Sequence, residues 1–140
     1  MKTNLQKAKE LLQTGEYTCV LCQGDTVFTS TERGVAPLVN WLSSGMDFHG
    51  FGAADKIVGR AAAFLYSLLG VDEVYASVMS EEAESLLLQL QISPSYEVKT
   101  EYIVNRAGTG GCPMEQAVKG ITEPEQALAA IRKKMKELSR

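Results

Sequence analysis

The sequence predicts one α/β domain over residues 1–140, a three-layer α/β/α sandwich with a mixed sheet. Three observations predict this fold class. The chain has 140 residues, which is the usual length of a single domain. Two strand-like segments joined by a Gly-Asp turn indicate a β-hairpin near the N-terminus. After the hairpin, helical and strand-like segments alternate, which is typical of parallel βα units with helices on both faces of the sheet.

The first elements are a helix and the hairpin. Residues 4–12 repeat apolar side chains at helical spacing, and Gly15 ends this pattern. Residues 17–23 are rich in Tyr, Thr, Val and Leu, which favour a strand. Gly24 and Asp25 turn the chain, and "TVFTS" at 26–30 returns as the second strand.

Two helices are expected next. The segment "APLVNWLSSG" predicts a short helix with Pro37 in its first turn and Gly45 at its end. The segment "AADKIVGRAAAFLYSLL", which begins at Ala53, predicts the most apolar helix of the chain, and Gly70 ends it. A helix that is apolar around most of its circumference is buried, so we expect this one to pack against the sheet.

The remaining segments complete the βα pattern. Residues 72–80 predict a strand, and Ser80 opens a further helix that stops before Pro94. Residues 95–105 alternate apolar and polar side chains, as a strand with one buried face does. A short helix after Cys112 and a last helix from residue 123 follow. The predicted order is α-β-β-α-α-β-α-β-α-α.

Composition limits the function classes. A net charge of −3 argues against a general nucleic-acid binder, which needs a basic face. No apolar run approaches the ~20 residues that span a bilayer, and the N-terminus lacks the apolar core of a signal peptide. Three cysteines in such a chain predict reduced thiols and a cytoplasmic location. Cys19 and Cys22 lie three apart on a predicted strand, so their side chains point to opposite faces, and we expect two small buried residues.

The stretch "NRAGTGGCPMEQAV" at 105–118 carries the first candidate site. Pro113 suits a first helical turn, which places Cys112 at the helix start, where free amides favour a thiolate. Cys112 is therefore a candidate nucleophile or redox-sensitive thiol, or a structural cap. Thr109 and the amides of Gly110 and Gly111 can hold a phosphate or carboxylate, or can form only a tight turn.

The loop "FHGFGAAD" leads into the second predicted helix start. His49 is the only histidine, and Gly52 and Ala53 border the expected helix. Asp55 would lie in the first turn of that helix, either as a general base or as a carboxylate that stabilises the helix dipole. We expect the two helix starts to meet over one crevice at the carboxyl ends of the strands.

Two further charged residues belong to the candidate site. Glu115 follows Cys112 by three residues, which is the spacing of a capping box, although a role as metal ligand stays open. Arg106 either pairs with an anion or ends a strand in solvent. Lys56 and Arg60 are four apart and would share one face of the predicted helix near the same crevice.

Three motifs carry a resemblance to a known family. The segments "GVAPL", "AADKIVGRAAA" and "GTGGCPMEQAV" resemble a small family of prokaryotic domains of unknown function that has the cytidine-deaminase-like fold. The resemblance spans nearly the whole chain. It implies a cytidine-deaminase-like sandwich with no established activity, and it implies that the chain can form a homo-oligomer.

The same resemblance bears on zinc. In zinc-dependent deaminases a zinc ligand and a catalytic glutamate open one helix, and two cysteines open another. In the resemblance Ala53 takes the place of the first ligand and Asp55 that of the glutamate. Cys112 matches the first cysteine, and Glu115 stands in place of the second. Alanine cannot bind a metal, and a third ligand requires His49 or Asp55, so we expect no cofactor and no zinc.

The sequence thus predicts a protein that binds a small anionic or nucleotide-like ligand without zinc. If the chain is an enzyme, Cys112 and Asp55 are the expected catalytic pair. The alternative is a metal-free or atypical zinc enzyme acting on a nucleoside- or nucleotide-like substrate as a hydrolase or deaminase. The expected ligand-binding residues are His49, Gly52, Ala53, Arg106, Thr109, Gly110, Gly111 and Glu115.

Overall fold

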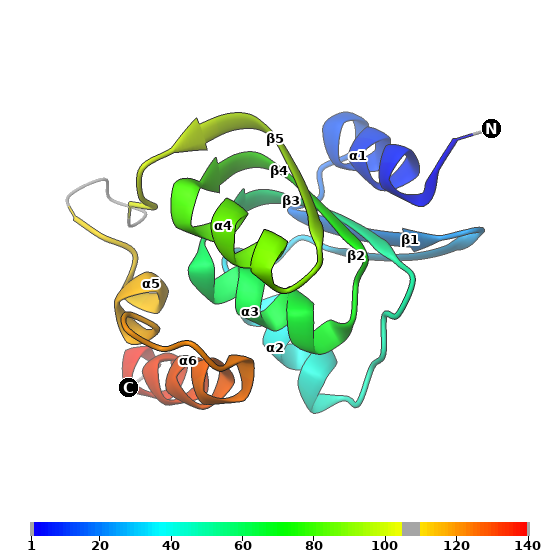
Figure 1. Cartoon of the computed structure of the whole chain (residues 1–140). Helices are drawn as coiled ribbons and strands as arrows, with labels where there is room; N and C mark the ends of the chain where they lie inside the picture. Colours follow the sequence, from blue (N-terminus) through cyan, green and yellow to red (C-terminus); the bar gives the residue numbers. More distant parts are fainter. Residues whose placement is uncertain (1, 105–109, 140) are drawn as a thin grey trace.

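The computed structural model describes residues 2–104 and 110–139 (Figure 1). It forms a five-stranded mixed sheet flanked by helices. The helices are α1 (Asn4–Thr14), α2 (Ala36–Ser43), α3 (Arg60–Leu69), α4 (Glu81–Gln89), α5 (Pro113–Ala117) and α6 (Pro124–Leu138); the strands are β1 (Cys19–Gln23), β2 (Thr26–Ser30), β3 (Gly52–Val58), β4 (Glu73–Ser80) and β5 (Ser93–Thr100). No helix in these ranges is both long and apolar enough to span a membrane.

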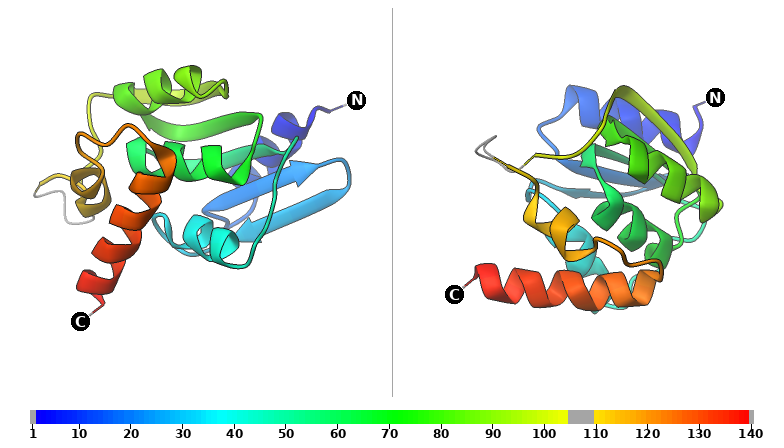
Figure 2. Two further views of the ribbon diagram at one scale, coloured as in Figure 1. Left: turned by 60° about the horizontal axis from the view of Figure 1, so that its bottom comes forward. Right: turned by 60° about the vertical axis from the view of Figure 1, so that its left-hand side comes forward.

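The sheet has the strand order β2-β1-β3-β4-β5. Strand β1 pairs antiparallel with β2 and β3, whereas β3, β4 and β5 are parallel to one another. Helix α1 packs on one face of the sheet, where it buries Val20, Ala54 and Tyr75. Helices α2, α3 and α4 bury the other face, and α6 lies outside α3, beside α5 (Figure 2). The predicted mixed sheet with flanking helices is confirmed.

One element was predicted wrongly. Residues 52–58 form the central strand β3, not the start of a helix, and the helix begins only at Arg60. The sequence pattern misleads because β3 is buried on both faces at Ala53 and Ala54, so it shows no alternation of polar and apolar residues. Alanine also has the highest helix propensity. The observed order is therefore α-β-β-α-β-α-β-α-β-α-α.

The other predicted elements are confirmed in type. Thr3 caps α1, Ser80 caps α4, and α2, α5 and α6 all begin at or next to a proline. Strand β5 is shifted against its predicted range and contains Pro94, which an edge strand tolerates because one side of its backbone needs no partner. The side chains of Cys19 and Cys22 point to opposite faces of the sheet, and both are buried.

Gly52, an expected ligand-binding residue, has a packing role. An added Cβ at this position would lie 2.8 Å from the backbone nitrogen of Leu5, in the first turn of α1. We expect Gly52→Ala to push α1 off the sheet and to lower the free energy of unfolding by about 2 kcal/mol, as overpacking does. Urea unfolding measures this effect. The control is Gly111→Ala, whose Cβ would meet only the end of Gln116 at 3.3 Å; an equal loss in both variants would contradict the prediction.

Candidate functional site

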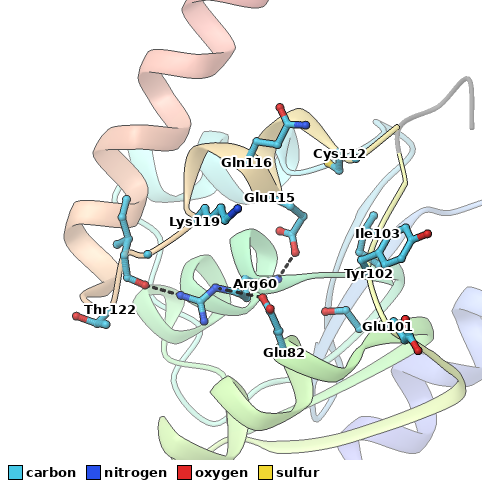
Figure 3. A pocket seen from close by; sticks show the side chains of 14 residues that line it. Arg60, Glu82, Glu101, Tyr102, Ile103, Cys112, Glu115, Gln116, Lys119 and Thr122 are labelled. Carbon is cyan, nitrogen blue, oxygen red and sulfur yellow. Dashed lines mark hydrogen bonds and ion pairs between the residues drawn. The ribbon is translucent and has the colours of Figure 1, made fainter. Parts of the chain in front are cut away.

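A hollow of about 490 Å³ opens where α3 and α4 begin, at the carboxyl end of β4 (Figure 3). Every lining residue lies between Arg60 and Thr122. One side of the hollow is formed by the starts of α3 and α4 and by residues 101–103 after β5. The other side is formed by α5 and by the chain that leads to α6. The carboxyl ends of parallel strands are the usual position of ligand sites in α/β sheets.

Cys112 lies at the start of α5, as predicted. It is the residue before Pro113, and its backbone is extended, with φ −64° and ψ 129°. Its N–H donates to the carbonyl oxygen of Ile103 at 3.1 Å, and Gly111 bridges to Val104. These contacts fix the start of α5 against the segment that follows β5. The thiol of Cys112 is half-buried and lines the hollow.

The Glu115 side chain joins α5 to α3. Its Oε1 accepts from the N–H of Arg60 and its Oε2 from the N–H of Ala61, both at 2.7 Å. The predicted capping box within α5 is therefore wrong: this carboxylate caps the neighbouring helix, and no side chain caps α5. Burial raises the pKa of Glu115, and the two backbone N–H groups together with the Arg60 charge oppose that rise.

Arg60 extends from the start of α3 into the hollow. Its guanidinium donates to the carbonyl oxygen of Ile121, and it lies 3.8 Å from the carboxylate of Glu82 (Figure 3). The Arg60 side chain is 21% exposed and that of Glu82 is 70% exposed, so the pair contributes little to stability. Lys119, on the α5 side, makes no ion pair with any other described residue.

Two helix starts do meet at the hollow, but the helix that meets α5 is not the predicted one. It begins at Arg60, seven residues after Ala53, because residues 52–58 are a strand. The resemblance placed Ala53 and Asp55 at this helix start, and that placement is wrong. Lys56 and Arg60 do not share a helix face for the same reason.

Several predicted ligand-binding residues lie away from the hollow. His49 lies next to Gly70, at the opposite end of α3 from Arg60; the Cβ of an alanine at Gly70 would be 3.2 Å from His49 Nδ1. Ala53 is fully buried in the core. Gly110 is exposed and does not line the hollow, whereas Gly111 does. Arg106 and Thr109 lie outside the described residues.

Asp55 belongs to a separate buried network and not to the lining of the hollow. Its Oδ2 accepts from the hydroxyl of Tyr66 at 2.6 Å, and its Oδ1 accepts from the N–H of Ile57 at 3.4 Å. The Tyr66 hydroxyl also lies 3.1 Å from Sγ of Cys19, which is the partner of Asp55 in the β1–β3 register. The network thus joins β1 and β3 to α3, on the face of the sheet that α3 covers.

Burial dominates the titration of this network. Burial raises the pKa of Asp55 to about 7, against the lowering effect of the Tyr66 hydroxyl and of backbone N–H groups. Burial likewise raises the pKa of Cys19 and of Tyr66, and the Asp55 charge adds to both rises. Asp55 therefore changes its charge near neutral pH.

Most residues that form the hollow were not predicted from the sequence. Glu82, Glu101, Tyr102 and Lys119 come from three segments, namely α4, the residues after β5 and the residues after α5, which only the fold brings together. No spacing pattern in the sequence marks them. Within residues 2–104 and 110–139, no three His, Cys, Asp or Glu side chains gather as metal ligands do.

Comparisons with known proteins identify the family. The sequence matches the family described as "TM1506: Domain of unknown function (DUF1893)" over residues 7–135. The structure is similar to the crystal structure of a DUF1893 family protein (TM1506) from Thermotoga maritima, with a TM-score of 0.83 and 26% sequence identity; the match covers 98% of this chain and 92% of that one. No curated protein matches the sequence. The chain therefore belongs to the DUF1893 family, whose function is unknown.

Proposed function

We propose that the protein binds a small nucleotide-like ligand with an anionic group in the hollow beside Cys112. The size of the hollow supports this, since about 490 Å³ lies within the usual range for small-molecule sites. The chemistry of its walls supports it further. Apolar surface at Tyr102 and Ile103 lies next to charged and hydrogen-bonding groups, as it does in sites that bind a planar ring with polar edges.

The charges in the hollow suggest how such a ligand lies. Lys119 and Gln116 are on the α5 side, and Glu82 and Glu101 are on the opposite side (Figure 3). An anionic group of the ligand is therefore placed toward Lys119. Hydrogen-bond donors, such as the exocyclic amine of a base, are placed toward the two carboxylates. Arg60 and Glu115 also line the hollow, but contacts within the chain hold both of them. The separation of Lys119 from Glu82 and Glu101 across the hollow is the observation that carries the proposal.

Calorimetry and thermal-shift assays test the proposal with nucleosides and their 5′-monophosphates. We expect a monophosphate whose base carries an exocyclic amine to bind and to raise the melting temperature. Lys119→Ala should weaken binding of the monophosphate about tenfold and leave binding of the matching nucleoside unchanged, because only the phosphate contacts the ammonium. Lys133→Ala, an exposed change on α6 outside the hollow, is the control. The proposal fails if no compound binds, or if both lysine variants weaken binding equally.

A metal-free enzyme is the second candidate, and the position of Cys112 favours it. This half-buried thiol is the one cysteine of the three that lines the hollow. As a nucleophile its sulfur would displace a leaving group from an electrophilic carbon of the bound ligand, for example an exocyclic amine that departs as ammonia with the thiol proton; water would then release the hydroxylated product and restore the thiol. Cys112→Ala should then retain ligand binding and lose turnover. Asp55, the expected acid/base partner, does not line the hollow, so this candidate rests on Cys112 alone.

The cytidine-deaminase-like fold stays part of the proposal. It is supported by two helices whose starts face each other across one site, with Gly59–Ala61 opening the first and Cys112–Glu115 the second. The described residues do not fit a deaminase zinc centre. No three His, Cys, Asp or Glu side chains of the described residues gather there, and both carboxylate oxygens of Glu115 are already held by backbone N–H groups. We therefore propose no zinc-dependent step.

A further inference from the structure

Helix α5 is a lightly packed wall of the hollow. None of its five residues is buried, although Val118, directly after it, is fully buried in the core. The N-terminal end of α5 is tied to Ile103 through the backbone N–H of Cys112. Between these two ends, the hydrogen bonds from α5 to α3 are those of the Glu115 carboxylate. Met114 adds apolar packing against the core, so the Glu115 carboxylate is the polar tie between the middle of this wall and α3.

The start of α3 is shaped to receive this carboxylate. An added Cβ at Gly59 would overlap Oε1 of Glu115 and lie 2.5 Å from its Cδ. We call the space beside the backbone of Gly59, which the Glu115 carboxylate occupies, the slot; only glycine at position 59 leaves it open. The two N–H groups that follow, those of Arg60 and Ala61, are among the unpaired donors of a helix start, and the carboxylate satisfies both.

The same helix start holds the far end of the wall. The Arg60 guanidinium donates to the carbonyl oxygen of Ile121, beyond the end of α5. Residues 59–61 therefore contact the wall in two ways, through the backbone at Glu115 and through a side chain at Ile121. Cys112 and Lys119, the residues assigned to ligand chemistry, lie on the segment held in this way.

We infer that Glu115, seated in the slot at Gly59, is a latch that holds α5 closed as a movable wall of the hollow. Release of the latch loosens residues 112–119 and leaves the sheet and α3 folded. The latch itself rests on contacts within the chain, whereas the use of the hollow as a ligand site rests on the proposed function. Opening of the latch would expose Cys112 and move Lys119 away from the ligand.

Two substitutions break the latch from opposite sides. Glu115→Gln keeps the length of the side chain but replaces one acceptor oxygen by an NH₂ group that faces a backbone donor. Gly59→Ala keeps Glu115 and its charge but fills the slot. The matched control is Glu125→Gln, which neutralises an exposed carboxylate on α6 outside the hollow.

Two measurements without ligand test the latch. The first is hydrogen exchange of the amides of residues 114–119, compared with those of β4. The second is the rate at which iodoacetamide labels Cys112, with the buried Cys19 and Cys22 reporting global unfolding. We expect both latch variants to raise local exchange and Cys112 labelling on the order of tenfold, with β4 exchange and the buried thiols unchanged. Glu125→Gln should match the wild type.

The double variant decides whether the two changes act on one contact. If Glu115 and Gly59 form a single latch, the double variant is no looser than either single variant. Effects that multiply would overturn the inference. So would wild-type exchange in Glu115→Gln, or labelling of Cys22 as fast as that of Cys112, since the contact would then support the whole fold. Failure of nucleotides to bind would overturn the proposed function and leave these results unaffected.

Discussion

Replacing Asp55 by asparagine is expected to stabilise the protein at pH 8 by up to about 4 kcal/mol, which raises the melting temperature on the order of 10 °C. Asparagine has the shape of the neutral aspartic acid and removes the buried charge. Asp55 is 8% exposed, and its hydrogen-bond partners, the Tyr66 hydroxyl and backbone N–H groups, carry no positive charge. The ionised carboxylate is therefore costly to hold in the fold.

The sign of the pH dependence follows from the direction of the pKa shift. The pKa of Asp55 rises from an ordinary value of 3.8 to about 7 on folding. Between these pH values the folded protein holds a proton that the unfolded chain has lost. The contribution of Asp55 to stability is therefore fully present below about pH 4, falls as the pH rises, and is lost above about pH 7.

Thermal unfolding of the wild type and of Asp55→Asn at pH 4 and pH 8 checks this prediction. The gap between the two proteins should be large at pH 8 and small at pH 4. Asp25→Asn, in the exposed hairpin turn, removes the same formal charge and controls for net charge. A gap of equal size at both pH values would show that Asp55 does not titrate as expected.

Replacing Tyr66 by phenylalanine is expected to destabilise the protein by about 3 kcal/mol at pH 8. The Tyr66 hydroxyl makes the shorter of the two hydrogen bonds that Asp55 accepts, at 2.6 Å against 3.4 Å for the N–H of Ile57. Hydrogen bonds to charged groups are stronger than those to neutral groups. Below pH 4 the acceptor is neutral, so the loss should fall to about 1 kcal/mol. The phenylalanine ring fills the same buried space, which keeps packing effects small.

Urea unfolding in two backgrounds checks the Tyr66 prediction. In Asp55→Asn, Tyr66→Phe should cost only about 1 kcal/mol at pH 8, because no charge remains to be bonded. The difference between the two backgrounds measures the coupling between the two side chains. An identical cost in both backgrounds would mean that the hydroxyl acts through Cys19 or through packing, and not through Asp55.

Local patterns predicted most elements of the fold. The hairpin, the caps at Thr3 and Ser80, and the prolines at helix starts act within a few residues, so the sequence displays them directly. Strand β3 could not be recognised in this way. Its conformation is set by pairing with β1 and β4 and by burial of both faces, and these are contacts with distant parts of the chain.

The candidate site was predictable only in part. The glycine–cysteine–proline order marked the start of α5, and Cys112 does line the hollow. The helix start that α5 contacts lies at Gly59–Ala61, because residues 52–58, which were expected to be the first turns of that helix, form strand β3. The spacing of Glu115 from Cys112 is that of a local cap. Nothing in the sequence indicates that its carboxylate contacts the start of α3, more than fifty residues earlier in the chain.

The hollow draws all its lining from Arg60 onward. The first 58 residues, with α1, the hairpin and β3, therefore contribute no lining residue to this hollow and support it through the packing of the sheet. If the hollow is the ligand site that we propose, differences in ligand specificity between family members should lie in residues 60–122.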